Sequence, residues 1–246
     1  EKVALETAFG ASLAGRRAFS AMKHVGLNVA ADPLFTMSYT GVNAGLVIAV
    51  ADDPAMHSSQ NEQDSRHYAR AAKLPMLEPS NSQEALAFTK LAYRLSEDFD
   101  TPVLLKMCTR VAHSQSVVAL GEREAPQAKA YTKSPGKYVM APANAVRRHP
   151  VVERRLLDLA AWAETAEINQ VEEGQNRETG IITSSTCYQY VKEACGHRFP
   201  VLKLGMVWPL PEKKIREFAQ SVNRLVVVEE GDPFIQAYCQ SLGLAP

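Results

Sequence analysis

Residues 44–52 read “AGLVIAVAD”, an unbroken run of apolar and small side chains that ends in an aspartate. A strand that is buried on both faces has this pattern, because neither face meets water. Strands of that kind belong to parallel sheets that are covered by helices. The run therefore predicts an α/β fold in which this segment is a strand of a mostly parallel sheet.

Patterns typical of helices and strands alternate on both sides of this run, as they do in chains built from βαβ units. A stripe of small residues at 3–15 predicts a helix that approaches another backbone closely. The other elements expected in this part are a strand at 17–23, a turn entering a helix at 24–35, helices at 64–72 and 82–99, and strands at 74–79 and 102–108. Ser80 or Ser82 is expected to cap the helix at 82–99.

The periodic pattern dissolves at residues 119–152, which are predicted to form a linker on the surface. Beyond it a second alternation begins. Its expected elements are helices at 151–173, 186–195, 211–222 and 232–243, and strands at 180–185, 199–206 and 224–231. We therefore predict an α/β domain at 1–118 whose N-terminal part is missing, then the linker, then a smaller α/β domain of about three strands at 153–246.

Composition excludes several classes of protein. The 27 Lys and Arg residues balance the 27 Asp and Glu residues, so no excess of charge indicates a nucleic-acid partner. No apolar run reaches the ~20 residues that span a bilayer, and no signal peptide is recognised. The cysteines are Cys108, Cys187, Cys195 and Cys239. Because they are scattered, we expect reduced thiols in a cytoplasmic protein and no metal site within this chain.

Polar segments follow three of the expected strands, at the edge where parallel sheets bind ligands. They are “HVGLN” (24–28), “DDPAMHSSQNEQDSR” (52–66) and “TRVAHSQ” (109–115). The side chains that could converge there are His24, His57, Gln60, Asn61, Glu62, Arg110 and His113. Strand ends also exit into ordinary solvated loops, so that alternative stays open. The chain has no G-x-G-x-x-G, P-loop, G-x-S-x-G or H-E-x-x-H motif, which disfavours a dinucleotide site of the usual kind.

Two long strings resemble the pyrimidine-binding domain of thiamine-diphosphate-dependent 2-oxoacid:ferredoxin oxidoreductases. They are “EKVALETAFGASLAGRRAFSAMKHVGLNVAADPLF” (1–35) and “DDPAMHSSQNEQDSRHYA” (52–69). Within that family they are most similar to α subunits of the indolepyruvate type. “KYVMAPANAVRRHP”, “GIITSS” and “LKLGMVWPLPE” resemble the domain that comes next in such subunits. The resemblance implies a pyrimidine-binding α/β domain followed by a smaller domain like the C-terminal domain of transketolase.

The resemblance also implies roles for single residues. Glu1 would be the catalytic residue, because the family's glutamate at this helix start exchanges a proton with N1′ of the aminopyrimidine ring. We expect such a carboxylate to be shielded from water. The residues implied in cofactor binding are Glu1, His24, Val25 and Gly26, with Gly26 allowing the ring to come close. The residues implied on the substrate side are His24, His57, Gln60, Asn61 and Glu62.

Two positions depart from the family's pattern. “TRVAH” resembles an R-x-S-H element of the wider family but has Ala112 where that element has serine. Whether Arg110 and His113 act in catalysis or hold subunits together therefore stays open. The superfamily usually has Ser-Gly where this chain has Ser184 and Ser185, so a tight glycine turn is not carried over.

Several parts that the family needs are absent from this sequence. It has no G-D-G segment for the diphosphate and Mg²⁺ and no cysteine clusters for [4Fe–4S] centres. The opening “EKVALETAFG” lacks a methionine, which predicts the middle of a longer polypeptide. The resemblance then implies a hetero-oligomer with a diphosphate-binding domain or subunit that shares thiamine diphosphate, a γ-type subunit, CoA as co-substrate, and ferredoxin or a similar electron acceptor.

Three functions are consistent with the sequence. The first is part of an enzyme that oxidatively decarboxylates an aryl-2-oxoacid, such as indolepyruvate or phenylpyruvate, to the acyl-CoA and passes electrons to ferredoxin. The second is a scaffold or binding subunit of such a complex without a catalytic role. The third, a flavodoxin-like or Rossmann-like binding module, depends only on the alternation of strands and helices.

Overall fold

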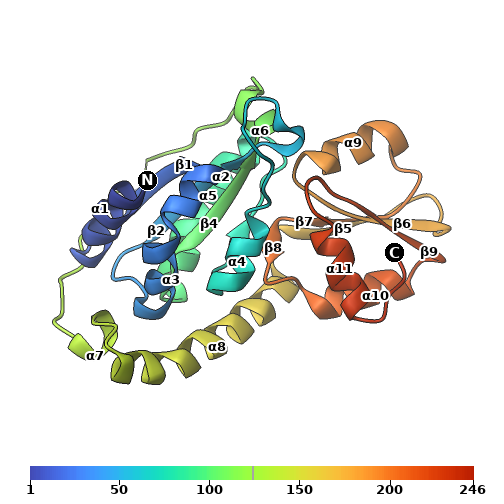
Figure 1. Ribbon diagram of the computed structural model, residues 1–246. Helices are drawn as coiled ribbons and strands as arrows, with labels where there is room; N and C mark the ends of the chain where they lie inside the picture. Colours follow the sequence, from blue (N-terminus) through green and yellow to red (C-terminus); the bar gives the residue numbers. More distant parts are fainter. Residues whose placement is uncertain (124) are drawn as a thin grey trace.

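The first sheet holds the predicted buried strand in its interior (Figure 1). The computed structural model describes residues 1–123 and 125–246. In order across the sheet, the strands are β1 (Ala18–Lys23), β2 (Leu46–Asp52), β4 (Val103–Cys108), β3 (Met76–Leu77) and β8 (Met206–Trp208). β1, β2, β4 and β3 run parallel to one another, and β8 is antiparallel to β3. The prediction of a buried strand in a mostly parallel sheet is confirmed.

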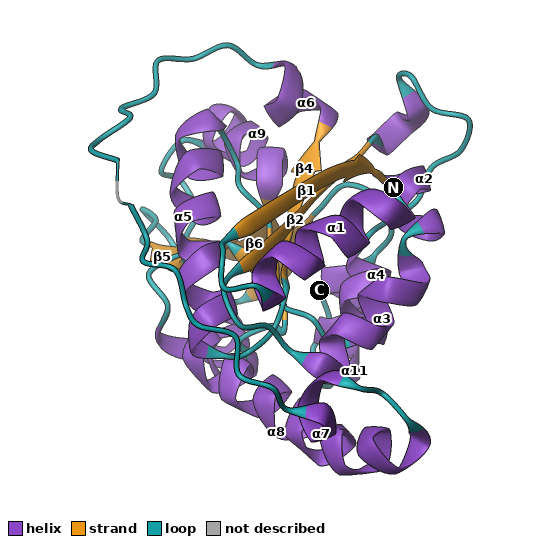
Figure 2. Cartoon of the chain, turned by 90° about the vertical axis from the view of Figure 1, so that its left-hand side faces the viewer, coloured by secondary structure: helices purple, strands orange, loops and turns teal. Residues whose placement is uncertain are grey.

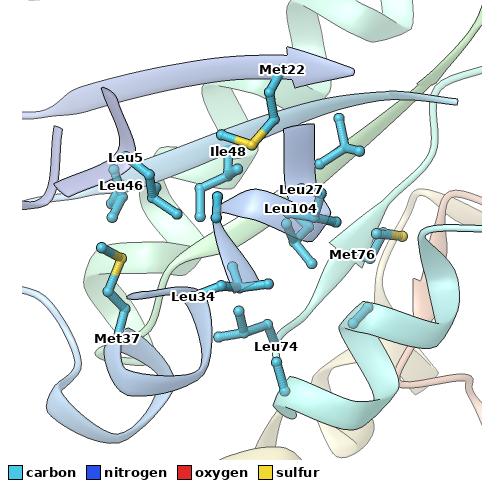
Figure 3. Packing of buried hydrophobic residues seen from close by; sticks show 14 of the residues in the cluster. Leu5, Met22, Leu27, Leu34, Met37, Leu46, Ile48, Leu74, Met76 and Leu104 are labelled. Carbon is cyan, nitrogen blue, oxygen red and sulfur yellow. The ribbon is translucent and has the colours of Figure 1, made fainter. Parts of the chain in front are cut away.

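Helices cover both faces of this sheet. The helices of the first half are α1 (Lys2–Leu13), α2 (His24–Val29), α3 (Ala31–Thr40), the 3₁₀ turn η1 (Pro54–Met56), α4 (Arg66–Ala72), α5 (Ser82–Asp98) and α6 (Thr109–His113). Leu5 of α1 and Leu34 of α3 pack with Ile48 of β2 (Figure 3). The preceding residue of the strand, Val47, packs with Leu95 of α5 instead. Alternate residues of β2 thus enter two different cores, which is why it carries no polar side chain until it ends.

The helix predicted at 82–99 is α5, but its cap is neither Ser80 nor Ser82. Asn81 Oδ1 accepts a hydrogen bond from Glu84 N at 2.9 Å. Ser80 donates from its backbone N and its Oγ to Glu84 Oε2, at 2.8 Å each. Reciprocal bonds of this kind satisfy free backbone donors at a helix start, and asparagine is a strong N-cap residue.

The second half of the described chain forms a four-stranded sheet, where about three strands were predicted. The elements of the second half are α7 (Pro135–Tyr138), α8 (Pro142–Thr165), β5 (Asn169–Glu172), β6 (Thr179–Ser184), α9 (Ser185–Cys195), β7 (Val201–Leu204), β8, α10 (Glu212–Gln220), β9 (Arg224–Val228) and α11 (Phe234–Ser241). Of its strands, β8 belongs to the first sheet. The strand order is β5-β7-β6-β9, with β5 antiparallel to β7 and the other pairs parallel.

Both predicted ends of the helix at 151–173 are wrong. α8 begins at Pro142, inside the segment predicted as a linker, and β5 occupies the last part of the predicted range. Asn169 explains the break, because its Nδ2 donates to Ala163 O at 2.9 Å and its Oδ1 accepts from Gly205 N at 3.0 Å. A buried amide needs such partners, and a continuous helix would remove them. The predicted domain boundaries stay predictions.

The strand predicted at 199–206 divides between the two sheets. After β7 the chain passes through Gly205 and continues as β8 in the first sheet, where Trp208 pairs with Met76 of β3. A Cβ at Gly205 would lie 2.6 Å from Ile168 O, so only glycine fits at this crossing. The first sheet therefore contains a strand from the second half of the chain.

Residues 125–134, which lead to α7, run along the surface of the first half (Figure 2). Lys129 N donates to Gly15 O at 3.0 Å, and Asn43 Nδ2 donates to Ala130 O at 3.2 Å. Gly15 has a φ of +84°, and a Cβ there would lie 1.7 Å from Lys129 O. This contact keeps the segment against the start of β1 and the end of α1.

Arg66 joins the two halves from within the interface. Its side chain is 1% exposed, and its guanidinium bonds Asp64 at 2.5 Å and Glu229 at 2.6 Å. It also donates to the backbone oxygens of Glu230 and Asp232, at 2.9 Å each. Burial alone would lower the pKa of Arg66, but the neighbouring carboxylates outweigh it and raise that pKa. The guanidinium therefore stays charged in the interior.

Lys106 and Glu78 form a second buried ion pair at the same interface. The other carboxylate oxygen of Glu78 accepts a hydrogen bond from Ser184 Oγ, in the second half, at 2.6 Å. Burial favours the neutral acid, but Lys106 and Arg66 outweigh it and hold the pKa of Glu78 below its usual range. The interface between the two halves thus contains charges whose desolvation is offset by close partners.

Candidate active site

The carboxyl ends of β1, β2 and β4 meet at one edge of the first sheet, as expected for parallel strands. Lys23 at the end of β1 is paired with Ala51, and Asp52 at the end of β2 is paired with Cys108. α2 follows β1 directly and α6 follows β4 directly. The three polar segments noted in the sequence therefore begin side by side at this edge.

Asp53 fixes the loop that follows β2. Its Oδ1 accepts from His57 N at 3.2 Å and from Thr109 Oγ1 at 2.6 Å. Its Oδ2 accepts from Ser58 N at 2.8 Å and from Ser59 Oγ at 2.5 Å. The bond from Ser59, with the others, holds the pKa of Asp53 well below its usual range. One charged carboxylate thereby sets the backbone path of the loop and connects it to α6.

His24 is the first residue of α2 and is 1% exposed. Its Nε2 lies 3.1 Å from the backbone oxygen of Asn61. Because a carbonyl oxygen only accepts, Nε2 is the donor in this contact, and in the tautomer that this bond favours Nδ1 keeps a free lone pair. Within the described chain, Nδ1 has no hydrogen-bond partner. His24 thus connects α2 to the loop after β2 and retains one buried, unpartnered acceptor.

Glu1 lies directly before α1, and its side chain covers Gly26 of α2. Its backbone oxygen accepts from Leu5 N at 2.9 Å, so Glu1 belongs to the first turn of α1. A Cβ added at Gly26 would lie 2.5 Å from Glu1 Cγ and 3.1 Å from Glu1 Oε1. Glu1 is exposed, so the described chain alone does not provide the shielding expected of this carboxylate. Val25 is half-buried beside this contact.

A cavity of about 420 Å³ lies between this edge and the second half of the chain. Its polar lining includes His57, Glu62 and Arg110 from the first half and Tyr190 and Glu230 from the second. Glu62 Oε2 accepts a hydrogen bond from Ala55 N, so the carboxylate is held at the cavity wall. His57, Arg110 and His113 also line an adjoining cavity of about 600 Å³.

The residues predicted to converge therefore fall into two neighbouring groups. His24 contacts the backbone of Asn61, and Glu1 contacts Gly26 of the same helix α2, whereas His57 and Glu62 face the cavity. Gln60 lies between the groups in sequence and is exposed. The loop after β2 contributes to both groups, and hydrogen bonds to Asp53 and His24 hold its backbone.

Sequence reasoning missed the residues that organise this edge. Asp53 carried a signal, since it is a second carboxylate directly after a buried strand, but its role as a hydrogen-bond centre depends on Thr109, far along the chain. Tyr190 and Glu230 line the cavity only because the second half folds back against the first. No local pattern could have assigned them to the site.

Ser185 shows how the departure from Ser-Gly is accommodated. Its φ is +51°, in the left-handed region that glycine favours, so the tight turn exists without a glycine. Ser185 Oγ lies 3.7 Å from Cys108 Sγ, and Thr186 Oγ1 lies 3.5 Å from the same sulfur. The start of α9 thereby packs against the end of β4, next to the cavity.

The four cysteines are free thiols, and Cys108, Cys187 and Cys239 are buried. Burial raises the pKa of Cys187 to about 12, so this thiol stays protonated. Among residues 1–123 and 125–246, no group of three or more His, Cys, Asp or Glu side chains could hold a metal ion. In the same residues, no helix combines the length and the apolar character needed to cross a membrane.

The fold and this edge define a class of α/β proteins that bind ligands beyond the ends of parallel strands. Two solved structures share the fold. The match to the 2-oxoglutarate:ferredoxin oxidoreductase from Magnetococcus marinus covers 98% of this chain and 51% of the oxidoreductase chain, with a TM-score of 0.75 and 16% sequence identity. The match to a split-gene transketolase covers 99% of this chain and 67% of the transketolase chain, with a TM-score of 0.61 and 14% sequence identity. The predicted fold class is confirmed.

Residues 1–180 match the family described as “Pyruvate flavodoxin/ferredoxin oxidoreductase, thiamine diP-bdg”, and the chain belongs to this family. Curated relatives named indolepyruvate oxidoreductase subunit IorA are similar along almost the whole chain. The one from Archaeoglobus fulgidus is 46% identical over 100% of this chain, and the one from Pyrococcus horikoshii is 42% identical over 96%. The chain spans 40% and 38% of these relatives' own lengths. The family resemblance seen in the sequence is confirmed.

Proposed function

We propose that this chain is the pyrimidine-binding part of a thiamine-diphosphate-dependent 2-oxoacid:ferredoxin oxidoreductase that acts on an aryl-2-oxoacid such as indolepyruvate or phenylpyruvate. The matched family supports the cofactor, and the names of the curated relatives support the aryl substrate. The observation that carries the proposal is the Glu1 side chain, which lies over Gly26 in the helix that begins with His24, at the carboxyl edge of the first sheet.

These residues fit the aminopyrimidine ring of that cofactor. Its ring nitrogen N1′ needs a carboxylate with which to exchange a proton, and its exocyclic amino group needs a hydrogen-bond acceptor. Glu1 supplies an exposed carboxylate, and His24 supplies a buried acceptor that has no partner within the described chain. When bound, thiamine diphosphate would supply the nucleophilic carbon and the electron sink for decarboxylation.

Glu1 then has one task, which is to hold and exchange a proton at the ring nitrogen. A carboxylate in this role is expected to be shielded from water. Since Glu1 is exposed in this chain, a diphosphate-binding domain that shares the cofactor would cover it. The same domain would hold the diphosphate and Mg²⁺, as the family resemblance implies.

The substrate side of the proposed site comprises His24, His57, Gln60, Asn61 and Glu62. His57 and Glu62 line a cavity that also contains Arg110, whose guanidinium can pair with the carboxylate of a 2-oxoacid. CoA would accept the acyl group. Electrons would leave through [4Fe–4S] clusters elsewhere in a hetero-oligomer that includes a γ-type subunit, towards ferredoxin or a similar acceptor.

A scaffold or binding subunit without a catalytic role is the second candidate function, and the exposure of Glu1 in this chain is consistent with it. Replacing Glu1 in the complete, assembled complex separates the two. Glu1→Gln should lower kcat for the aryl-2-oxoacid by about 10²- to 10⁴-fold, the usual contribution of a positioned proton-transfer group.

Glu6→Gln is the matched control, because Glu6 is an exposed glutamate on the same helix. It should leave kcat near the wild-type value, and both variants should have the melting temperature of the wild type. Wild-type turnover by Glu1→Gln would remove Glu1 from the mechanism and favour the scaffold.

A further inference from the structure

We infer that Gly26 is a positioning residue, which places the Glu1 carboxylate by leaving room for the side chain of Glu1. This inference rests on the proposed function of Glu1. The sequence suggested that Gly26 lets the cofactor ring come close. The structure shows that the space beside Gly26 is taken by Glu1 itself.

The contact is close enough to exclude any other residue at position 26 without movement of Glu1. A Cβ there would lie 2.5 Å from Glu1 Cγ and 3.1 Å from both Glu1 Cδ and Glu1 Oε1. Non-bonded carbon atoms are at their optimum at about 3.5–4.0 Å, so the added atom and the side chain of Glu1 cannot both stay in place.

Backbone conformation gives no separate reason for a glycine at this position. Gly26 is not among the glycines with positive φ, and it lies within α2. In a helix, glycine is less favourable than alanine, because it has more conformational freedom to lose on folding. A glycine that the backbone does not need, in a helix that it weakens, is explained by the space that it leaves for Glu1.

The backbone of Glu1 cannot move away to restore the contact. Leu5, one turn later in α1, is 0% exposed in the first core and bonds Glu1 O at 2.9 Å. At the other end of α1, Ser12 Oγ donates to Ala44 O, next to the start of β2. With the helix held at both ends, a Cβ at position 26 must displace the side chain of Glu1.

Displacement of this kind should reduce catalysis more than stability. A misplacement of about 1 Å at a reacting group can cost about 100-fold in rate. Gly26→Ala in the complete complex should therefore lower kcat by about 10- to 100-fold. The melting temperature of the cofactor-free complex should stay at or above the wild-type value, because the Glu1 side chain can turn outwards into solvent and alanine favours the helix.

Gly10→Ala is the matched control. Gly10 also lies within a helix, α1, and apart from its chain neighbours and the backbone of its own helix, no described atom lies within 4 Å of a Cβ built there. It should retain wild-type kcat, so it reports the effect of a glycine-to-alanine change in a helix without the contact. A crystal structure of the Gly26→Ala complex should show the Glu1 carboxylate displaced.

Double variants identify the partner of Gly26. If Gly26 acts through Glu1, Glu1→Gln/Gly26→Ala should be no slower than Glu1→Gln alone. If Gly26→Ala lowers the melting temperature, Glu1→Ala should restore it, because the clashing side chain is then gone. Three results would each overturn the inference. They are a kcat of Gly26→Ala within twofold of the wild-type value, a double variant in which the two losses of kcat add, and a lowered melting temperature of Gly26→Ala that Glu1→Ala does not restore.

The proposed function and this inference fail in different experiments. An inactive Glu1→Gln enzyme together with a fully active Gly26→Ala enzyme would overturn only the role of Gly26. A fully active Glu1→Gln enzyme would overturn the proposed role of Glu1. In that case the crystal structure of Gly26→Ala still decides whether the steric contact is real.

Discussion

The polar run “HSSQNEQDSR” (57–66) has two parts that differ in almost everything except composition. In the first part His57, Gln60 and Glu62 are exposed. In the second part Asp64 is 8% exposed and Arg66 is 1% exposed. The first part lies at the edge where the proposed site is, and the second lies between the two halves of the chain.

The difference lies in which atoms have partners. In the first part the backbone is held, by Asp53 and His24, while several side chains remain available to a ligand. In the second part the side chains themselves are paired, with Arg66 bonded to Asp64 and Glu229. Backbone anchoring leaves side chains free to bind a ligand, whereas side-chain pairing holds the two halves of the chain together. Mutations in the first part should therefore change activity more than stability, and mutations in the second part should change stability more than activity.

The largest effect on stability is expected for Arg66→Met. It removes the cation between Asp64 and Glu229 and leaves two buried carboxylates without it, which should lower the free energy of unfolding by about 3–5 kcal/mol. Urea denaturation of the complete polypeptide measures this. Arg70→Met, on the exposed side of the same helix, should cost about 1 kcal/mol or less. Equal losses in the two variants would contradict the comparison.

A smaller effect, with a dependence on pH, is expected for Glu78→Gln. The pKa of Glu78 in the folded protein lies below its ordinary value of 4.5, so the charged form favours folding. Its contribution is fully present above pH 4.5 and is lost as the pH falls below that value towards the folded pKa. At pH 7 the variant should lose about 1.5–3 kcal/mol.

The melting temperatures of Glu78→Gln and the wild type should therefore converge as the solution is acidified. Glu193→Gln, at an exposed position of α9, should follow the wild type at every pH. A constant difference between Glu78→Gln and the wild type from neutral to acidic pH would show that the carboxylate charge does not hold the interface together.

The smallest effect on stability is expected for Gln60→Ala, in the exposed part of the run. The free energy of unfolding should change by no more than about 0.5 kcal/mol. The ratio of kcat/KM for indolepyruvate to that for phenylpyruvate should change instead, since Gln60 is proposed to face the substrate. Gln170→Ala, exposed on β5, should leave both quantities unchanged. A marked loss of stability without a change in selectivity would make Gln60 a structural residue.

Much of the first sheet could be predicted from local pattern. β2 was evident because a strand buried on both faces must be apolar throughout, and the polar segments marked where the strands end. The errors occurred where one distant contact overrode the local pattern. Asn169 ends the preceding helix through bonds to Ala163 and Gly205, and Gly205 lets the next strand leave its sheet.

The candidate site was predictable to the level of segments, with single residues supplied by the family resemblance. His24, His57, Gln60, Asn61 and Glu62 do lie at the expected edge, although their roles stay predictions. The organising role of Asp53 and the packing of Glu1 on Gly26 were not visible in the sequence. Both depend on distances between separate elements, which no spacing along the chain encodes.

The sequence by itself determined the α/β class, the buried strand β2 and the edge at which ligands are expected, because these follow from which side chains avoid water along one continuous segment. Only the tertiary structure decided which polar residues of 57–66 face solvent and which join the halves. That choice depends on partners such as Glu229, which is paired with Arg66 across the interface. A charge is stable in the interior only next to such a partner, and the partner is brought there by folding.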